Sequence, residues 1–201
     1  MLPYFTRILF LFSSIVLLTA CGDGADKSTS DKAAYNKAEI TLSEAGVGPI
    51  NAQTPFNIHK ITEAFQSFKK YHVEQLQTQE EGIDYPVIRV SKDTDTMLLI
   101  NPALDQNKIF SIVIKDKRIG NSLGHELGAE YGAIYSYGKL EQCSAGAESL
   151  SGKVLCYAPN SGNVLYMFGD KNPNDFPDGS LPPIDALDKW NLEAIIWKPK
   201  K

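Results

Sequence analysis

The first twenty residues indicate the compartment in which the rest of the chain folds. Arg7 is their only charged residue, and it is followed by thirteen residues, Ile8–Ala20, that are apolar except for three hydroxyl side chains. A helix of that length, at 1.5 Å per residue, is too short to cross a hydrocarbon core of about 30 Å. The pattern therefore predicts a lipoprotein-type or secretory signal peptide over residues 1–20.

Cys21 follows this apolar stretch directly. The segment Leu18-Thr19-Ala20-Cys21 has the pattern of a bacterial lipobox, in which an aliphatic residue and two small residues precede a cysteine. We predict that the mature chain begins at Cys21 and is anchored by acyl chains such as palmitate, since each buried CH₂ contributes about 0.8 kcal/mol. Gly22 stands where an aspartate would favour the inner membrane, so we expect the periplasmic face of the outer membrane. The alternatives are an ordinary secretory signal with a coincidental cysteine, or a short membrane helix.

Residues 22–41 are small, polar and charged, without a sustained apolar period. This composition is typical of a flexible tether. We expect the lipidated cysteine and tether to occupy residues 21–42 and one globular domain to occupy residues 43–201.

The overall composition narrows the class of protein. With 43% apolar residues the chain can bury a core, and its net charge is −4. A net negative charge without Lys/Arg-rich runs lacks the electrostatic footprint of nucleic-acid binding, so we expect no nucleic-acid partner.

Two cysteines remain besides Cys21. Cys143 and Cys156 would close a loop of fourteen residues, and an oxidising compartment favours a disulfide worth about 3 kcal/mol. The pair is not Cys-x-x-Cys, and no histidine lies within ten residues of either cysteine. A redox-active pair and a metal site are therefore weaker interpretations of Cys143 and Cys156 than a structural disulfide.

The hydrophobic pattern predicts two helices and several strands. Apolar side chains recur at helical spacing over Ile58–Phe65 and over Ser122–Tyr131. Strand-like segments follow each helix, at residues 71–76, 87–100 and 109–115 and at residues 134–142, 154–167 and 192–198. Because the connections are short, the strands should pair antiparallel. We predict an α+β fold in which two helices pack on a mainly antiparallel β-sheet.

The two sets of segments also follow one another in the same order. Residues 87–100 and 154–167 are 67 positions apart, and the last strands are 83 apart, with the added residues in a Pro/Asp-rich surface loop at 169–188. This favours an internal duplication of a helix-plus-antiparallel-strands unit, with pseudo-repeats at about 46–116 and 117–201. The alternative is that any α+β domain shows loosely similar apolar blocks.

Motifs for metal binding are incomplete. Asp170, Asn172, Asn174 and Asp178 match oxygen-ligand positions of a calcium loop, but the turn glycine and the closing glutamate are absent. His125-Glu126 begins a zincin motif, but Ala129 stands where the second histidine is needed. We expect no metal and no cofactor.

Signatures of catalysis are also missing from the sequence. It contains no Gly-x-Ser-x-Gly nucleophile elbow, no Gly-x-Gly-x-x-Gly and no Walker loop. We therefore predict no catalytic residues and a protein that is not an enzyme.

Aromatic residues gather near the C-terminus. Phe176, Trp190 and Trp197 are candidates for an exposed binding surface toward a glycan or peptide. Packing in the core or at an edge is the alternative interpretation.

Several blocks together resemble a small family of enterobacterial-type lipoproteins that contain a domain of unknown function. They are residues 43–48, the Gly-Ala-Glu-Tyr-Gly block at 128–132, Cys143, Cys156 and the ending from Trp190 to Trp197. The resemblance implies control by an envelope-stress sigma factor, and it brings no catalytic residue.

These observations lead us to expect a non-enzymatic, lipid-anchored periplasmic protein that binds an envelope protein or a cell-wall partner. The alternative is a carrier of an apolar ligand such as a lipid, held in a cavity between sheet and helices. An apolar cavity of several hundred Å³ would favour the carrier.

Overall fold

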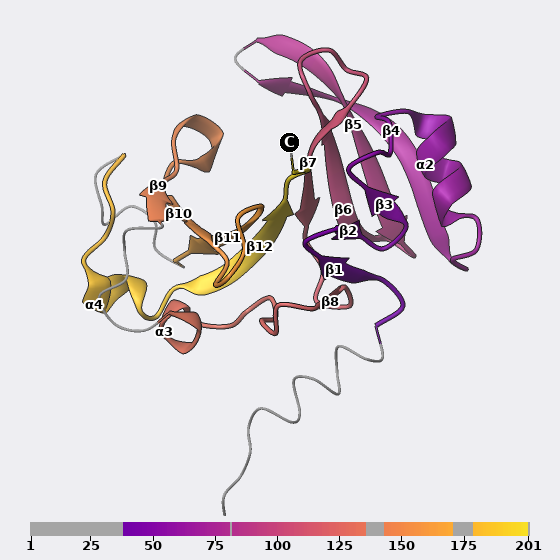
Figure 1. Cartoon of the computed structure of the whole chain (residues 1–201). Coiled ribbons are helices and arrows are strands. Elements are labelled where there is room, and N and C mark those ends of the chain that lie inside the picture. Colours follow the sequence, from indigo (N-terminus) through magenta and orange to yellow (C-terminus); the bar gives the residue numbers. More distant parts are fainter. Residues whose placement is uncertain (1–37, 81, 136–142, 171–178, 201) are drawn as a thin grey trace, which may run out of the picture.

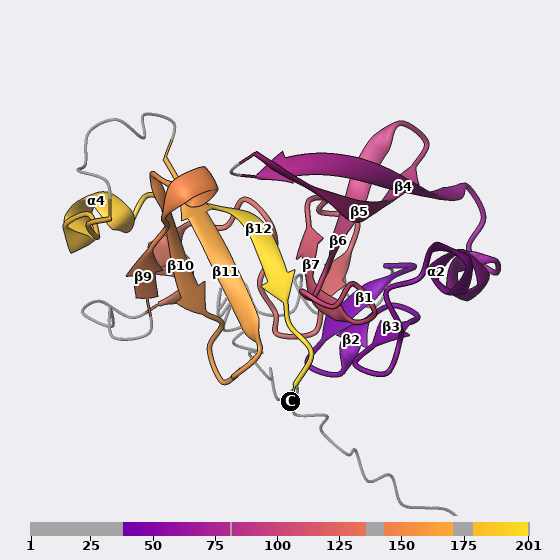
Figure 2. The same ribbon diagram turned by 90° about the horizontal axis from the view of Figure 1, so that it is seen from above.

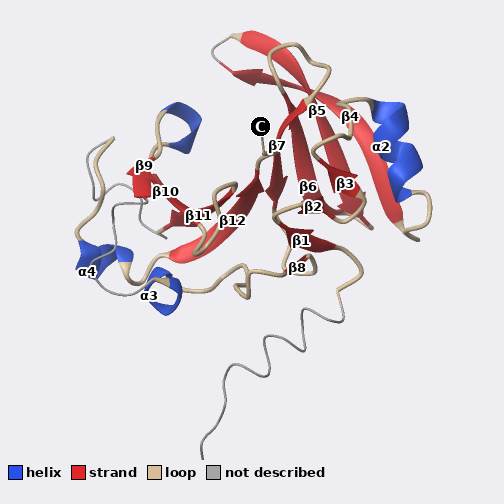
Figure 3. Ribbon diagram, viewed as in Figure 1, coloured by secondary structure: helices blue, strands red, loops and turns tan. Residues whose placement is uncertain are grey.

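The computed structural model describes residues 38–80, 82–135, 143–170 and 179–200. Strands are the predominant regular element of these residues, and the helices are short (Figure 3). The elements are β1 (Thr41–Ser43), β2 (Gly46–Val47), β3 (Ile50–Asn51), α2 (Ile58–Phe65), β4 (Tyr71–Glu80), β5 (Ile83–Lys92), β6 (Asp95–Pro102), β7 (Ile109–Ile114), β8 (Gly120–Asn121), α3 (Tyr131–Ile134), β9 (Cys143–Ala145), the 3₁₀ turn η1 (Glu148–Leu150), β10 (Lys153–Tyr157), β11 (Val164–Gly169), α4 (Ile184–Leu187) and β12 (Asn191–Trp197). Among the described residues, no helix has the length and apolar character needed to cross a membrane.

A sheet of eight strands runs through the molecule (Figure 1). Its order is β4-β5-β6-β7-β12-β11-β10-β9, and every neighbouring pair is antiparallel. The sheet thus consists of two four-stranded meanders that meet where β7 pairs with β12, with Val113 opposite Ile196. The strands predicted around residues 87–100, 109–115, 154–167 and 192–198 are confirmed, as is their antiparallel pairing.

The first predicted helix is confirmed and the second is wrong. Helix α2 begins after Asn57, whose side chain accepts hydrogen bonds from the backbone N–H groups of His59 and Lys60. Residues 122–130 form turns instead, and only Tyr131–Ile134 makes a single helical turn.

Local chemistry explains the missing helix. Gly124 and Gly128 have φ values of 87° and 92°, a left-handed conformation that an α-helix cannot contain. The Asn121 side chain accepts a hydrogen bond from the Leu123 N–H and donates one to the His125 carbonyl, which supplies the backbone with partners outside a helix.

The predicted α+β class is therefore incorrect. The protein is mostly β, with one eight-stranded and one four-stranded sheet, and two helices do not cover the large sheet as expected. The predicted duplication of a helix-plus-strands unit fails for the same reason, because residues 122–130 supply no counterpart to α2.

The small sheet has the order β3-β2-β1-β8. It lies with α2 beside β4–β7, whereas α3 and α4 lie beside β9–β12 (Figure 1 and Figure 2). One continuous core joins these layers to one face of the large sheet. It includes Leu42 from β1, Ile61 from α2, Ile112 from β7 and Trp197 from β12, all 0% exposed. Burial of these side chains on one face leaves the other face of the large sheet outside the core.

The packed part of the chain begins before residue 43. Ile40 is 1% exposed and β1 starts at Thr41, two residues before the predicted domain start at residue 43. The expected signal peptide and most of the expected tether lie outside the described residues.

Candidate functional site

A row of side chains crosses the face of the large sheet that lies opposite the core. It consists of directly paired residues from five neighbouring strands, namely Leu99, Val113, Ile196, Leu165 and Tyr157. Directly paired residues of antiparallel strands point to the same face. With about 4.8 Å between strands, the row is about 19 Å long. We call this surface the open face and these five residues the cross-strand row.

Two cavities lie over the open face. The inner cavity has a volume of about 420 Å³, and its apolar lining includes Leu99, Val113, Leu155, Leu165, Met167 and Ile196. The outer cavity has a volume of about 680 Å³ and is lined by Ile83, Asp84, Tyr85, Leu104, Phe110 and Glu148, among others. Tyr85, Pro102 and Phe110 line both cavities, so the two form one continuous groove. Their volumes are in the range of small-molecule sites.

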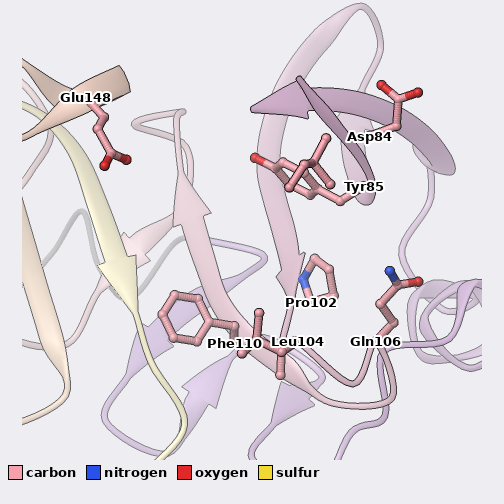
Figure 4. Close-up of a pocket in the computed structure, with 9 residues that line it drawn as sticks. Asp84, Tyr85, Pro102, Leu104, Gln106, Phe110 and Glu148 are labelled. Atoms are coloured by element: carbon pink, nitrogen blue, oxygen red, sulfur yellow. The ribbon is translucent and has the colours of Figure 1, made fainter. Parts of the chain in front are cut away.

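The free end of the β4–β5 hairpin forms one wall of the groove. Pairing between β4 and β5 continues to Glu80 and Ile83, whereas pairing between β5 and β6 begins only at Ile88. The hairpin therefore projects past its neighbour and brings Tyr85 over the groove. Glu148 of η1 reaches toward the cavity from the opposite side (Figure 4).

Exposed apolar side chains concentrate at this groove. Among the described residues the large hydrophobic side chains with high exposure are Leu104 (105%), Ile83 (69%), Phe110 (53%) and Tyr157 (44%). The first three line the outer cavity, and Tyr157 ends the cross-strand row. A grouped apolar surface of this kind marks an interaction site more often than scattered exposed residues do.

Charges are distributed unevenly along the groove. Lys115 and Lys198 are the charged residues that line the inner cavity, whereas Asp84 and Glu148 line the outer one. The Lys198 ammonium lies 4.8 Å from the centre of the Phe110 ring, a cation–π contact at the junction of the two cavities. Within the described residues neither lysine forms an ion pair with a carboxylate.

A model of a protein family described as "Protein of unknown function (DUF1131)" matches residues 26–199. The chain belongs to the DUF1131 family. The crystal structure of the uncharacterized protein yfeY from Escherichia coli is similar to this chain, with a TM-score of 0.64 and 26% sequence identity. That match covers 79% of this chain and 99% of the E. coli chain. A search of curated proteins found no significant match.

The disulfide predicted for this DUF1131 protein is present. Cys143 and Cys156 are directly paired residues of β9 and β10, with Cα atoms 4.0 Å apart. The bond fixes the last strand of the sheet and closes the loop that carries η1, so it also holds the η1 wall of the groove.

The predicted aromatic surface is not found. Trp190 is 3% exposed and Trp197 is 0% exposed, so both belong to the core. The Trp197 indole N–H donates a 3.1 Å hydrogen bond to the Glu44 carbonyl and ties β12 to the N-terminal segment. Phe176 and the lipidation site Cys21 lie outside the described residues.

His125 contributes to a polar cluster on the core side of the sheet. Its Nδ1 lies 3.0 Å from the Tyr166 hydroxyl, which also accepts a 3.0 Å hydrogen bond from Asn121 Nδ2. Burial raises the pKa of Tyr166 to about 12, and the hydrogen bond from Asn121 opposes this shift. No group of three or more metal-ligating side chains occurs in the described ranges.

Sequence reasoning placed the strands of the open face but missed the groove. Val113 and Ile196 look like core residues, because both lie in strands that are apolar at consecutive positions. Such runs are typical of strands buried on both faces. They could have indicated a second apolar surface, although not whether another layer covers it. The carrier alternative placed a cavity between sheet and helices, whereas both cavities lie on the other face.

Proposed function

We propose that this DUF1131 protein is a non-enzymatic, lipid-anchored binding protein of the periplasm, held in the outer membrane through Cys21. Its binding site is the groove over the open face. The observation that carries this proposal is the cross-strand row, which presents apolar side chains beneath an overhanging hairpin.

The groove supports binding because its surface gains free energy when it is covered. Removing apolar surface from water contributes about 25 cal/mol per Å². The exposed apolar surface at the groove lies mainly on Leu104, Ile83 and Phe110, which line the outer cavity. The strands beneath the inner cavity are paired with their neighbours on both sides, so a ligand would meet a largely preformed site.

Binding can be tested in cells with a photoactivatable amino acid in the full-length chain. Placed at Leu165 on the groove floor, it should form a covalent adduct. Placed at Lys117, which is exposed and does not line either cavity, it should not. Equal adduct yields at both positions would refute the groove as the site.

The anchor rests on the lipobox pattern and is tested separately. Mass spectrometry of the mature N-terminus should find Cys21 with acyl chains, and Cys21→Ser should release the protein from the outer-membrane fraction. An unmodified N-terminus at another residue would contradict the anchor without affecting the groove.

The family resemblance adds a proposal about expression, namely control by an envelope-stress sigma factor. The transcript should rise when outer-membrane assembly is disturbed in the native host. An unchanged transcript level would remove this part of the proposal alone.

A further inference from the structure

We propose that the occupant of the groove is the acyl chain of a single-chain anionic lipid, a long-chain fatty acid. This inference rests on the proposed binding function and names its ligand class. It is argued from the chemistry of the groove floor, the width of the cross-strand row and the position of two lysines that form no ion pair with a carboxylate of the described residues.

The groove floor favours hydrocarbon over peptide. Backbone N–H and C=O groups in the middle of a sheet bond to neighbouring strands, so the open face presents side chains and no free backbone groups. A peptide laid on Val113, Ile196 and Leu165 would lose water from its own amides without gaining partners. A hydrocarbon chain has no such groups and incurs no such penalty.

The row is one side chain wide where it crosses β6 and β7. On one side Asn101 donates a 3.1 Å hydrogen bond to the Ser111 hydroxyl, so the next positions along the two strands are polar. On the other side stands Lys115. One acyl chain fits between these limits, whereas two parallel chains would place one of them over polar side chains.

The charges favour an anionic headgroup. The inner cavity is lined by Lys115 and Lys198, and its lining contains no carboxylate from the described residues. Lys198 stands beside Phe110 at the mouth of this cavity, where it can donate hydrogen bonds to a carboxylate while the chain lies on the apolar floor. The carboxylates of Asp84 and Glu148 lie in the outer cavity and would disfavour an anion placed there.

The test is a fluorescence titration of the full-length mature chain, carrying Cys21→Ser to remove its own lipid, with anthroyloxy-labelled palmitate. We expect saturable binding. The matched alcohol, which carries the same fluorophore without the carboxylate, should bind about tenfold more weakly, since a charge-assisted hydrogen bond is lost.

Three variants locate the ligand. Lys198→Ala should weaken palmitate about tenfold and leave the alcohol unchanged, whereas the exposed Lys117→Ala should change neither. Leu165→Asp should abolish binding of both, with its thermal unfolding measured to verify folding. If Leu165→Asp does not fold, the headgroup comparison with Lys198→Ala still decides the question.

The outcomes separate this inference from the proposed function. No saturable palmitate binding, or equal affinity for acid and alcohol, overturns the fatty-acid ligand. Competition by phosphatidylglycerol vesicles at lower concentration than palmitate would overturn the single-chain assignment. A protein adduct from the photoactivatable residue at position 165 would sustain the binding function and refute the lipid, and absence of any adduct would refute both.

Discussion

Reduction of the Cys143–Cys156 disulfide should destabilise the whole domain and loosen one wall of the groove. The bond joins β9, the last strand of the large sheet, to β10 and closes a loop that contains η1. Without it, β9 is held, within the described residues, by three residues paired with β10. The unfolded chain also gains freedom, and this is the larger effect in the chain-entropy description.

The expected magnitude follows from the size of the loop. The cysteines are 13 positions apart, so the bond closes a ring of fourteen residues. Chain entropy assigns such a loop about 3 kcal/mol at 25 °C. For a domain of roughly this length, 1 kcal/mol corresponds to about 2–4 °C in Tm, so reduction should lower Tm by about 6–12 °C.

The assay is thermal unfolding followed by circular dichroism, with and without dithiothreitol, on the Cys21→Ser chain so that only the paired thiols respond. Thiol titration verifies complete reduction. A Cys143→Ser/Cys156→Ser double variant serves as the control and should not respond to dithiothreitol. If free thiols appear and Tm stays within about 2 °C, then β9 is not part of the cooperative unit and the entropy argument fails for this loop.

Three further changes test the fold. Ile112 is 0% exposed, so Ile112→Ala should lower the free energy of unfolding, measured by chemical denaturation, by about 2–5 kcal/mol. Val113→Ala on the open face should lower it by less than half as much. Equal losses would contradict the assignment of the two faces. Trp197→Phe removes the indole hydrogen bond to the Glu44 carbonyl, which keeps its bond from Asn163, and it also leaves a cavity at a position that is 0% exposed. Denaturant unfolding should therefore show a loss of more than about 1 kcal/mol, and no loss would rule out a stabilising role for that bond. The pKa of Tyr166 is raised to about 12, so the folded state holds the phenol proton more tightly than the unfolded state does. The free energy of unfolding should therefore be constant below about pH 10 and fall by roughly 2–3 kcal/mol between pH 10 and 12. Tyr166→Phe should reduce that slope, and an unchanged slope would assign it to other groups.

The strands were predictable because their turns are marked in the sequence. Asp93 lies between β5 and β6 with φ 56°, and Asn160 lies between β10 and β11 with φ 60°. Both residue types adopt this left-handed conformation at low cost. Apolar runs on either side of such residues predict hairpins with few alternatives.

The false helix shows the limit of spacing arguments. Leu123, Leu127 and Tyr131 repeat every four residues and do contact the core, as helical residues would. The two glycines between them adopt positive φ, so the same three contacts come from a series of turns. Periodicity records which side chains are buried, and it does not record the backbone path that brings them there.

The groove could not be predicted because it depends on one face of the large sheet being left without a covering layer by the residues that the structure describes. Lys198 is a charged residue at the end of a strand, and Phe110 is one aromatic among many in the sequence. Their pairing over the junction of two cavities requires the β7–β12 contact between segments more than eighty positions apart. Only that contact shows that Val113 and Ile196 stand side by side.

Adjacent residues of the central strands point to opposite faces of the large sheet, so one face supports folding and the other is available to a ligand. On β7, Ile112 and Ile114 pack against the core while Val113 lies on the open face; on β12, Trp197 packs against the core while Ile196 lies on the open face. A substitution on the open face removes contacts that the core does not use. At a partly exposed position such as Val113, its cost to folding should therefore be smaller than that of a core substitution and its cost to a bound ligand large. Ile196 is only 8% exposed, so its substitution should affect both. A groove that only filled space between packed layers would show the opposite relation, because its floor would then support the fold itself.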